Sequence, residues 1–364
     1  MTRIAILTNV VLPGDAVSND VLGMRDALSA EGHEVQVFAT GAAVEAGIAK
    51  AAPDAIGYLR DPNDCLIYHF AFGWEPGLDL LRNVRCKRVV KYHNVTPPEF
   101  FEGYSQEYVD GCRRGREHVA LVAQAGCDLY LSDSDYNAGE LIAAGAVPAR
   151  SFVVPPFHHI DRLESVAADQ AVLRRYGQDG LTNLVNVGRI VPNKRHELLL
   201  ESFARYRSQY DPSARLLIVG REDDRLAAYG RRLRRWARLL GLGDSAVFTG
   251  GVTDEQLKAI YSVAAAFVLT SEHEGFSVPL VEAMAARVPI VAVAAGAVAG
   301  TVGDAGIVWG ERDPALIAAG VDAVVRNKDL RNGLSVLGQK RYRERFSNQQ
   351  IRTRLLGALG PLFR

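Results

Sequence analysis

Short, almost continuously apolar runs alternate with helix-forming segments along this chain of 364 residues. Runs of this kind are expected of strands that are covered on both faces of a parallel sheet. Alternation of strand and helix is in turn typical of doubly wound α/β domains. The pattern occurs twice, which predicts two domains. The predicted strands are 3–9, 34–39, 65–70, 88–93, 128–132 and 152–155, and then 183–187, 215–219, 246–249, 265–269 and 290–293.

The break between the two series indicates where the domains divide. The alternation pauses after Pro155-Pro156, and a polar stretch rich in Asp and Arg continues to about Gly180. We place a linker there, between a first domain over 1–158 and a second domain over 172–341. Each half has the size and strand content of a nucleotide-binding fold, although no sequence repeat connects them.

The amino-acid composition argues against several other classes of protein. The 42 basic and 42 acidic residues balance, whereas nucleic-acid-binding proteins usually carry a basic excess. The four cysteines form no CxxC pair, which favours reduced thiols in a cytoplasmic protein over a zinc site or a disulfide framework. The opening residues do not resemble a signal peptide, and the most apolar stretch, 289–303, is too short to cross a bilayer.

Ligands of open α/β sheets bind beyond the carboxyl ends of the strands, so the loops after strands are the ones to inspect. The loop after 183–187 contains Gly188, Arg189 and Lys194, and we expect Asn193 to cap the following helix. Two cations beside a helix N-terminus suit a diphosphate. The alternative is a solvated pair of basic residues in a turn, and the loop alone does not decide between the two.

A second loop, 271–282, follows the predicted strand 265–269 and carries two carboxylates eight residues apart, Glu274 and Glu282. The backbone N–H groups of Phe276 and Ser277 are candidates for binding an anion or a hydroxyl. Carboxylates accept hydrogen bonds from sugar hydroxyls, so one of them would hold a hexose and the other a ribose. The alternative for Glu282 is a solvent-facing position on a helix.

The order G-R-x-x-x-x-K at 188–194, the V-G turn at 219–220 and E-G-F-x-x-P-x-x-E at 274–282 together resemble the retaining glycosyltransferases of family 4. The resemblance implies the GT-B architecture, in which two Rossmann-like domains face a central cleft. The second domain would bind a nucleotide-sugar donor and the first the acceptor. The last helical stretch, 342–364, would cross back to join the first domain.

The resemblance also implies roles for individual residues. Arg189 and Lys194 would neutralise the donor's phosphates, Glu274 would contact the sugar hydroxyls and Glu282 the ribose. His93 matches the family's histidine near the sugar. The remaining donor-binding positions would be Gly14, Gly188, Gly275, Phe276 and Ser277.

Two positions depart from the family pattern. The family usually has two glycines in the loop after the first strand, whereas here only Gly14 is glycine, which weakens the expected diphosphate contact. Ser277 stands where glycine is common, and this could alter the preference near O4 of the sugar.

Four other signals are weighed against simpler explanations. Asp133-Ser134-Asp135 matches a metal-binding DxD pattern, but its place before a predicted helix favours capping. The glycines of 241–246 precede a strand, so they do not form a dinucleotide fingerprint. His158-His159 lacks spaced partners for a metal. The basic, amphipathic segment 231–240 would suit contact with anionic lipid, although we favour an apolar stripe facing the core with a solvated basic face.

The predicted reaction is transfer of a hexosyl or deoxyhexosyl group from a nucleotide sugar, such as GDP- or UDP-hexose, to an acceptor hydroxyl. It would proceed with retention and without a metal or cofactor. The acceptor would be a saccharide or lipid-linked saccharide of bacterial polysaccharide assembly, recognised by the aromatic loop 94–112. Alternatives are a nucleotide-sugar epimerase and a catalytically silent nucleotide-sugar sensor. The hypothesis of a glycosidase is disfavoured, because Arg189 and Lys194 would then have no role in the reaction. The sequence does not specify the base, the sugar or the oligomeric state.

Overall fold

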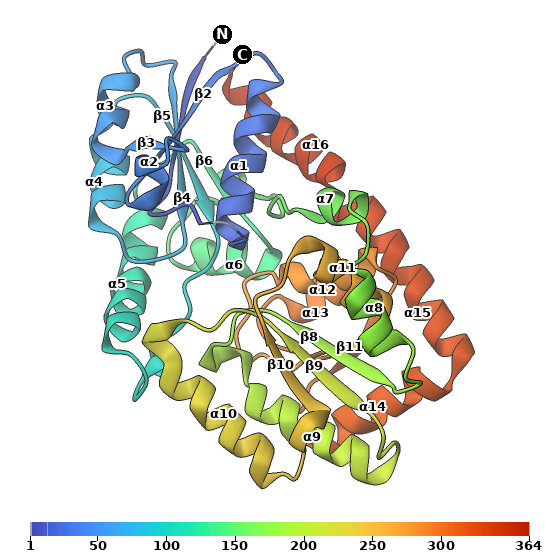
Figure 1. Cartoon of the computed structure of the whole chain (residues 1–364). Helices are drawn as coiled ribbons and strands as arrows, with labels where there is room; N and C mark the ends of the chain where they lie inside the picture. Colours follow the sequence, from blue (N-terminus) through green and yellow to red (C-terminus); the bar gives the residue numbers. More distant parts are fainter. Residues whose placement is uncertain (1, 13, 364) are drawn as a thin grey trace. The chain divides into compact units, whose positions relative to one another are not determined.

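The computed structural model describes residues 2–12 and 14–363 and divides into two compact units (Figure 1). The first unit contains Met1–Glu99, Glu107–His158 and Ser347–Arg364, and the second contains Phe100–Gln106 and His159–Phe346. Each unit is built on one parallel sheet covered by helices on both faces.

The first sheet has seven parallel strands in the order β3-β2-β1-β4-β5-β6-β7. Alternate residues of β1 point to opposite faces: Ala5 and Leu7 belong to one buried cluster, and Ile4 and Ile6 to another. The sheet therefore has a core on each side, as the continuous apolar runs predict. The strands are β1 Arg3–Leu7, β2 Glu34–Ala39, β3 Lys50–Ala51, β4 Cys65–Phe70, β5 Lys87–Tyr92, β6 Leu129–Ser132 and β7 Ser151–Val153.

Helix α16 (Asn348–Leu359) comes from the far end of the sequence and packs on the first unit beside α1 (Figure 1). Its residues Ile351, Leu355 and Leu359 are fully buried in the core that α1 covers. Tyr342 and Phe346 belong instead to the core of the second unit, so the chain changes units at Ser347. The other helices that cover the first sheet are α1 Ala16–Ser29, α2 Ala42–Glu45, α3 Ala55–Tyr58, α4 Glu75–Asn83, α5 Gln106–Ala123 and α6 Asp135–Ala143.

The second sheet has six parallel strands in the order β10-β9-β8-β11-β12-β13. Counted along the chain, both sheets begin with the order 3-2-1-4-5-6 of the Rossmann fold, which confirms the doubly wound prediction. The strands are β8 Asn183–Val187, β9 Arg215–Val219, β10 Ala246–Gly250, β11 Ala264–Leu269, β12 Ile290–Val293 and β13 Gly306–Trp309. The helices are α7 Ile160–Ser165, α8 Gln170–Gly177, α9 His196–Gln209, α10 Ala227–Leu239, α11 Asp254–Ser262, α12 Val278–Ala285, α13 Val298–Val302, α14 Pro314–Arg326 and α15 Lys328–Arg341.

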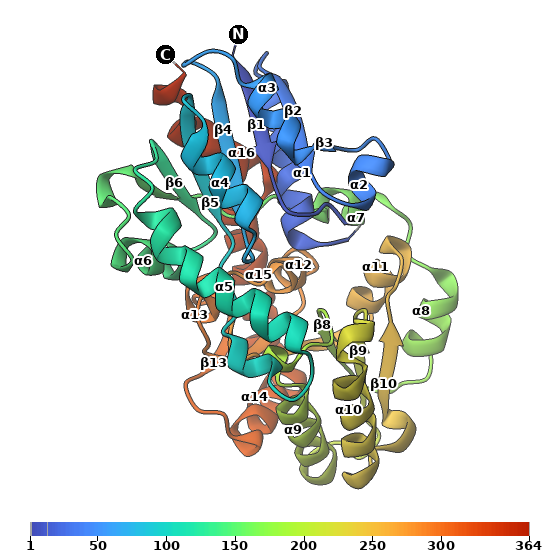
Figure 2. The same cartoon turned by 90° about the vertical axis from the view of Figure 1, so that its left-hand side faces the viewer.

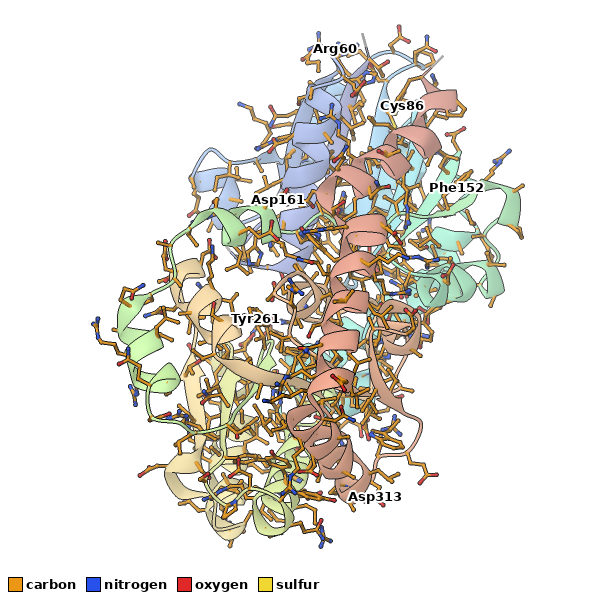
Figure 3. The ribbon with its side chains drawn as sticks, turned by 90° about the vertical axis from the view of Figure 1, so that its right-hand side faces the viewer. Arg60, Cys86, Phe152, Asp161, Tyr261 and Asp313 are labelled. Carbon is orange, nitrogen blue, oxygen red and sulfur yellow. The ribbon has the colours of Figure 1, made fainter. Side chains whose placement is uncertain are left out.

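The structure differs from the sequence prediction mainly at sheet edges and in the interval expected to be a linker. The two edge strands β3 and β13 were not predicted, because β3 has two residues and every residue of β13 is only partly buried. On β7, the other edge strand of the first sheet, Phe152 is 41% exposed (Figure 3). The expected linker contains α7 and α8, and Ile160 and Leu163 of α7 lie in the core of the second unit.

The basic segment that begins at Arg231 lies on α10, which runs beside α9 (Figure 2). Tyr229, Leu233 and Ala237 of α10 are buried in the second unit, and Arg234 pairs with Glu222. Trp236 and Leu240 also pack against this core, whereas Leu239 is 66% exposed, so the predicted apolar stripe faces the core except at Leu239. Among the described residues, no helix is long and apolar enough to cross a membrane.

Candidate functional site

Two glycines shape the loop that follows β8. Gly188 has a φ of +152°, and a Cβ on Gly220 would lie 1.7 Å from the carbonyl oxygen of Gly188. The carboxyl ends of β8 and β9 can approach this closely only because neither position carries a side chain. Arg189, which follows Gly188, is exposed and has no ion-pair partner among the described residues.

The prediction that Asn193 caps the next helix is wrong. Pro192–Lys194 form a single 3₁₀ turn, Arg195 takes a left-handed conformation with φ of 50°, and α9 begins only at His196. Asn193 is buried and donates its side-chain N–H to the carbonyl oxygen of His273 at 3.2 Å. This bond fastens the loop after β8 to the loop after β11.

Lys194 and Glu274 meet where these two loops lie side by side. The Lys194 Nζ is 2.7 Å from Glu274 Oε1, which also accepts a hydrogen bond from Ser271 Oγ at 2.7 Å. Glu274 is 5% exposed and the Lys194 side chain is 20% exposed. A Cβ on Gly296 would lie 2.3 Å from the carbonyl oxygen of Glu274, so this glycine lets a neighbouring loop approach the Glu274 backbone closely. The structure thus brings two predicted site residues into direct contact.

Glu282 lies one turn inside α12 and is not solvent-facing, since it is 4% exposed. Its Oε2 accepts a hydrogen bond from Tyr261 Oη at 2.8 Å, and its Oε1 is 3.7 Å from His159 Nε2. Tyr261 comes from α11 (Figure 3). Burial raises the pKa of Glu282, against the opposing effects of His159 and the tyrosine hydroxyl. The carboxyl group is therefore held in place within the second unit.

The segment between Glu274 and Glu282 is partly buried in the core of the second unit. The Phe276 ring packs edge-on against Phe346 with centroids 5.5 Å apart, and its carbonyl oxygen accepts a hydrogen bond from Thr301 Oγ1. Only the backbone of Phe276 is therefore suited to touch a ligand. Ser277 takes a left-handed conformation, φ 74°, immediately before α12, which explains why glycine is common at this position.

In the first unit, Gly14 also has a positive φ, of +74°, and nothing lies within 4 Å of where its Cβ would be. Asp15, the next residue, caps α1 by accepting from the Ser18 N–H at 3.0 Å. The neighbouring Pro13 lies outside the described residues. Gly14 therefore stands in open space at the carboxyl end of β1.

His93 belongs to a buried network at the carboxyl ends of β4 and β5. Its Nδ1 is 2.9 Å from Asp133 Oδ2, and its Nε2 is 2.9 Å from Nδ1 of His69. Lys91 is fully buried, lies 2.6 Å from Asp133 Oδ1 and also donates to the Val154 carbonyl. Both ring nitrogens of His93 are thus engaged within the first unit.

Asp20 of α1 completes the network, 3.8 Å from Lys91 Nζ. Burial raises the pKa of Asp20, whereas His93 and Lys91 overcome the effect of burial on Asp133 and lower its pKa. Burial lowers the pKa of His69 well below its usual value. Sequence reasoning missed Asp20, His69 and Lys91. The one available signal was the charge of Lys91, which directly follows the buried apolar residues Val89 and Val90 in β5.

Asp20, His69 and His93 have ligand types that suit a metal ion, and their ligand atoms lie within 4.8 Å of one another. The two imidazoles, however, lie end to end: their facing nitrogens are 2.9 Å apart, their centroids 5.1 Å apart and their planes 25° apart. Zinc needs about 2 Å on each side of the ion, so only a proton fits on this line. The second aspartate of the DxD pattern, Asp135, is exposed in the first turn of α6, which Ser134 caps.

The tip of the loop expected to recognise the acceptor belongs to the second unit. Tyr104 packs edge-on against Tyr229 at 5.3 Å and accepts a hydrogen bond from Arg232 Nη1 at 2.8 Å. The Phe100 ring lies 6.3 Å from that of His273, in the loop that carries Glu274. Residues 100–106 therefore border the carboxylate loop directly.

The two sheets and the site at the carboxyl ends of β8 and β11 define a GT-B fold. The structure resembles sucrose-phosphate synthase from Thermosynechococcus elongatus with a TM-score of 0.79 at 19% identity, covering 100% of this chain and 99% of that one. It also resembles Anabaena HepE in complex with UDP and glucose, with a TM-score of 0.74 at 20% identity, covering 99% and 100%. At such identities the likeness shows the fold.

Sequence comparison identifies the family of the second half. Residues 177–341 match the family Glycosyl transferases group 1. The chain is 33% identical to D-inositol 3-phosphate glycosyltransferase from Geodermatophilus obscurus over 254 residues, which are 67% of this chain and 54% of that protein. It is 32% identical to mannosylfructose-phosphate synthase from Agrobacterium fabrum over 177 residues, 47% of this chain and 38% of that protein. This chain thus carries a group 1 glycosyltransferase domain, which confirms the resemblance drawn from 188–194 and 274–282.

Proposed function

We propose that this chain transfers a hexosyl or deoxyhexosyl group from a nucleoside diphosphate sugar to an acceptor hydroxyl, with retention at the anomeric carbon and without a metal ion. The observation that carries the proposal is the contact between Lys194 and Glu274 at the carboxyl ends of β8 and β11, beside the N-terminus of α12. A cation, a carboxylate and a helix N-terminus are what a phosphorylated sugar needs at one place.

Each of the two cations has a task when a donor binds. Arg189 is exposed and without an ion-pair partner among the described residues, so it is available to a phosphate oxygen. The Lys194 ammonium would leave its ion pair with Glu274 and bind the diphosphate instead. The Glu274 oxygen would then be available to accept a hydrogen bond from a sugar hydroxyl. Charge on the departing diphosphate would then be stabilised by both side chains without a metal ion.

The contacts of the two carboxylates support a reaction with retention and without a covalent intermediate. Glu274 Oε1 is held by both Lys194 and Ser271, and Glu282 is bound to Tyr261 and has a raised pKa. Neither group is a free carboxylate poised as a nucleophile. We therefore favour attack on the face that the phosphate leaves, with a phosphate oxygen accepting the acceptor's proton and catalysis resting on positioning.

The donor and acceptor classes are supported by the relatives. Glu282, held by Tyr261, would accept hydrogen bonds from the ribose. One relative, 27% identical over 59% of this chain, is a GDP-mannose-dependent mannosyltransferase from Mycobacterium tuberculosis, and HepE was solved with UDP and glucose. GDP- or UDP-hexose is accordingly the proposed donor. A relative 28% identical over 82% of this chain and 75% of its own length is O-antigen chain mannosyltransferase B of Escherichia coli, which supports a saccharide or lipid-linked acceptor.

In the first unit, His93 and Gly14 would approach the sugar and the diphosphate. His93 acts here as a ring held in a fixed orientation by Asp133 and His69. We place the reaction in the cytoplasm, where nucleotide sugars are made. The group 1 domain favours transfer over the epimerase and sensor hypotheses.

A thermal-shift panel of UDP-, GDP-, ADP- and dTDP-sugars tests donor binding, because a ligand of the folded state raises Tm by mass action. One donor should raise Tm equally with and without excess EDTA, and its turnover should persist in EDTA. Activity that is abolished by EDTA and restored by Mg²⁺ or Mn²⁺ would contradict the metal-free proposal. NMR of the glycosylated product should show the donor's anomeric configuration.

A further inference from the structure

The outward face of α10 carries a row of arginines that the proposed reaction does not use. Helix α10 contains no acidic residue and packs against α9 in the second unit (Figure 1, Figure 2). Arg231, Arg235 and Arg238 are all exposed. Residues four and seven positions apart lie on the same face of a helix, so the three guanidinium groups point to the same side of α10.

These three arginines have no ion-pair or hydrogen-bond partner among the residues that the structure describes. The other arginines of the helix do have partners: Arg232 lies 3.6 Å from Glu197, and Arg234 pairs with Glu222. The carboxylates beside α10 are therefore engaged at the edges of its exposed face. The positive charge of the central row is left without a counterpart on the protein.

Leu239 continues this row at its C-terminal end, four residues after Arg235. Its side chain is 66% exposed, the largest exposed fraction of any large hydrophobic residue in 2–12 and 14–363. Leu233 and Ala237 of the same helix are instead buried in the core of the second unit. Contact of apolar surface with water is unfavourable. The outward face of α10 thus combines a row of unpaired cations with one uncovered leucine.

This combination fits the surface of an anionic phospholipid bilayer. Arginine side chains are attracted to negatively charged headgroups, and a leucine beside them can enter the boundary with the acyl chains. A nucleic acid fits less well, because the chain has no basic excess and Trp236 donates to Glu201 at 3.1 Å and packs on the core, away from any base. A protein partner would need a larger apolar centre than one leucine.

We propose that the outward face of α10, formed by Arg231, Arg235, Arg238 and Leu239, binds the surface of an anionic phospholipid bilayer. The helix lies on the bilayer, because its opposite face is held by the core of the second unit. Such binding is reversible and weakens as salt screens the charges. It would bring the proposed reaction to the surface where a lipid-linked acceptor resides. It requires no nucleotide sugar, so it can be tested apart from that reaction.

Flotation of the full chain with vesicles tests the proposal. Wild type should bind vesicles of equal parts phosphatidylcholine and phosphatidylglycerol, less so as salt rises, and should not bind phosphatidylcholine alone. The triple variant Arg231→Gln, Arg235→Gln and Arg238→Gln should bind the anionic vesicles about a hundred-fold more weakly, since each arginine near such a surface contributes about five-fold. Leu239→Ser should weaken binding roughly ten-fold.

A matched control removes the same charge from three separate helices. Arg82, Arg174 and Lys328 are exposed on α4, α8 and α15, and their joint replacement by glutamine should leave vesicle binding as in wild type. All variants should keep native circular dichroism and wild-type affinity for the nucleotide of the preferred donor. These two readouts exclude misfolding as the cause of lost vesicle binding.

Wild type that does not bind anionic vesicles, or an α10 triple variant that binds them as well as wild type, would overturn the proposal. Equal loss in the control variant would also overturn it, because net charge alone would then account for binding. A single-stranded oligonucleotide that displaces the vesicles from wild type would show that the occupant is a nucleic acid. Failure of wild type to bind any nucleotide, with vesicle binding intact, would contradict only the proposed function, so the two failures are distinguishable.

Discussion

The two units bury charged side chains in opposite ways. In the first unit, Asp133, Lys91 and His93 satisfy one another at 2.6–2.9 Å within a fully enclosed network. In the second unit, Lys194 and Glu274 also pair, but the lysine is 20% exposed, and the Arg189 and Ser277 side chains beside them lack partners among the described residues. Both groups lie at the carboxyl ends of parallel strands.

The first group is closed to solvent, although Asp20 Oδ2 and His69 Nε2 have no hydrogen-bond partner among the described residues, whereas the second group is the site that we propose for the donor. Charges that neutralise one another inside a protein orient their neighbours, and removing one of them leaves an uncompensated buried charge. Groups that remain unpaired at a strand end are available to a substrate. We therefore expect substitutions in the first network to affect folding most and substitutions at the second site to affect donor binding and turnover most.

The largest expected effect is that of Lys91→Met on stability. Without the ammonium, Asp20 and Asp133 face each other in the core, and the free energy of unfolding should fall by about 3–5 kcal/mol. Urea unfolding followed by circular dichroism measures this. Lys50→Met, at an exposed position on β3, is the control and should change stability by less than about 0.5 kcal/mol. If Lys91→Met is as stable as wild type, the buried charges of the first unit do not serve folding, and the proposed difference between the two units is wrong.

Lys194→Ala should act on the reaction instead. Loss of the ammonium should raise the barrier by roughly 2–4 kcal/mol, as loss of a donor to a developing anion does. Its circular dichroism should remain native, and the exposed Lys328→Ala should turn over like wild type. A folded Lys194→Ala protein with wild-type turnover would show that the phosphate assignment is wrong.

Glu274→Ala and Glu282→Ala should then fail differently. In the proposed reaction Glu274 holds the sugar, which changes during the reaction, so loss of its carboxylate should mainly lower kcat. Glu282 is proposed to hold the ribose, which changes little during the reaction. Its loss should therefore raise the donor KM about ten-fold or more and also weaken binding of the free nucleoside diphosphate. Calorimetry with the nucleoside diphosphate decides between them: lost binding in Glu274→Ala and retained binding in Glu282→Ala would mean that the two roles are reversed.

The effect that is smallest at neutral pH concerns His196, the first residue of α9. Burial lowers its pKa from 6.5 to about 3, and neither ring nitrogen has a partner among the described residues. Below about pH 6.5 the imidazole of His196 is therefore protonated in the unfolded chain but stays neutral in the folded chain. Above about pH 6.5 this histidine does not lower the free energy of unfolding. As the pH falls from there toward 3, the free energy of unfolding decreases by up to about 1.4 kcal/mol per pH unit. His196→Leu should flatten the pH dependence of urea unfolding relative to wild type, and equal slopes would refute the assignment.

Much of the fold was predictable from local pattern. Strands β2, β4, β8, β9 and β12 begin and end where the predicted runs do, because a strand covered on both faces is mostly apolar along its length. Short or half-buried edge strands such as β13 give no such signal. The family motif located Lys194 and Glu274 in sequence, although neither motif indicates that the two side chains touch.

The sequence by itself determined the two doubly wound domains and singled out the loops at 188–194 and 274–282 as candidate sites, since periodicity and short motifs are local properties. Only the tertiary structure decided which charges are buried and what they face. It placed Glu282 against Tyr261 and left the Ser277 hydroxyl without a partner among the residues that the structure describes. It also joined Asp20, His69 and Lys91 from three separate elements into one network around His93. Burial and pairing depend on residues far apart in the chain, and those contacts set each group's pKa and its availability to a ligand.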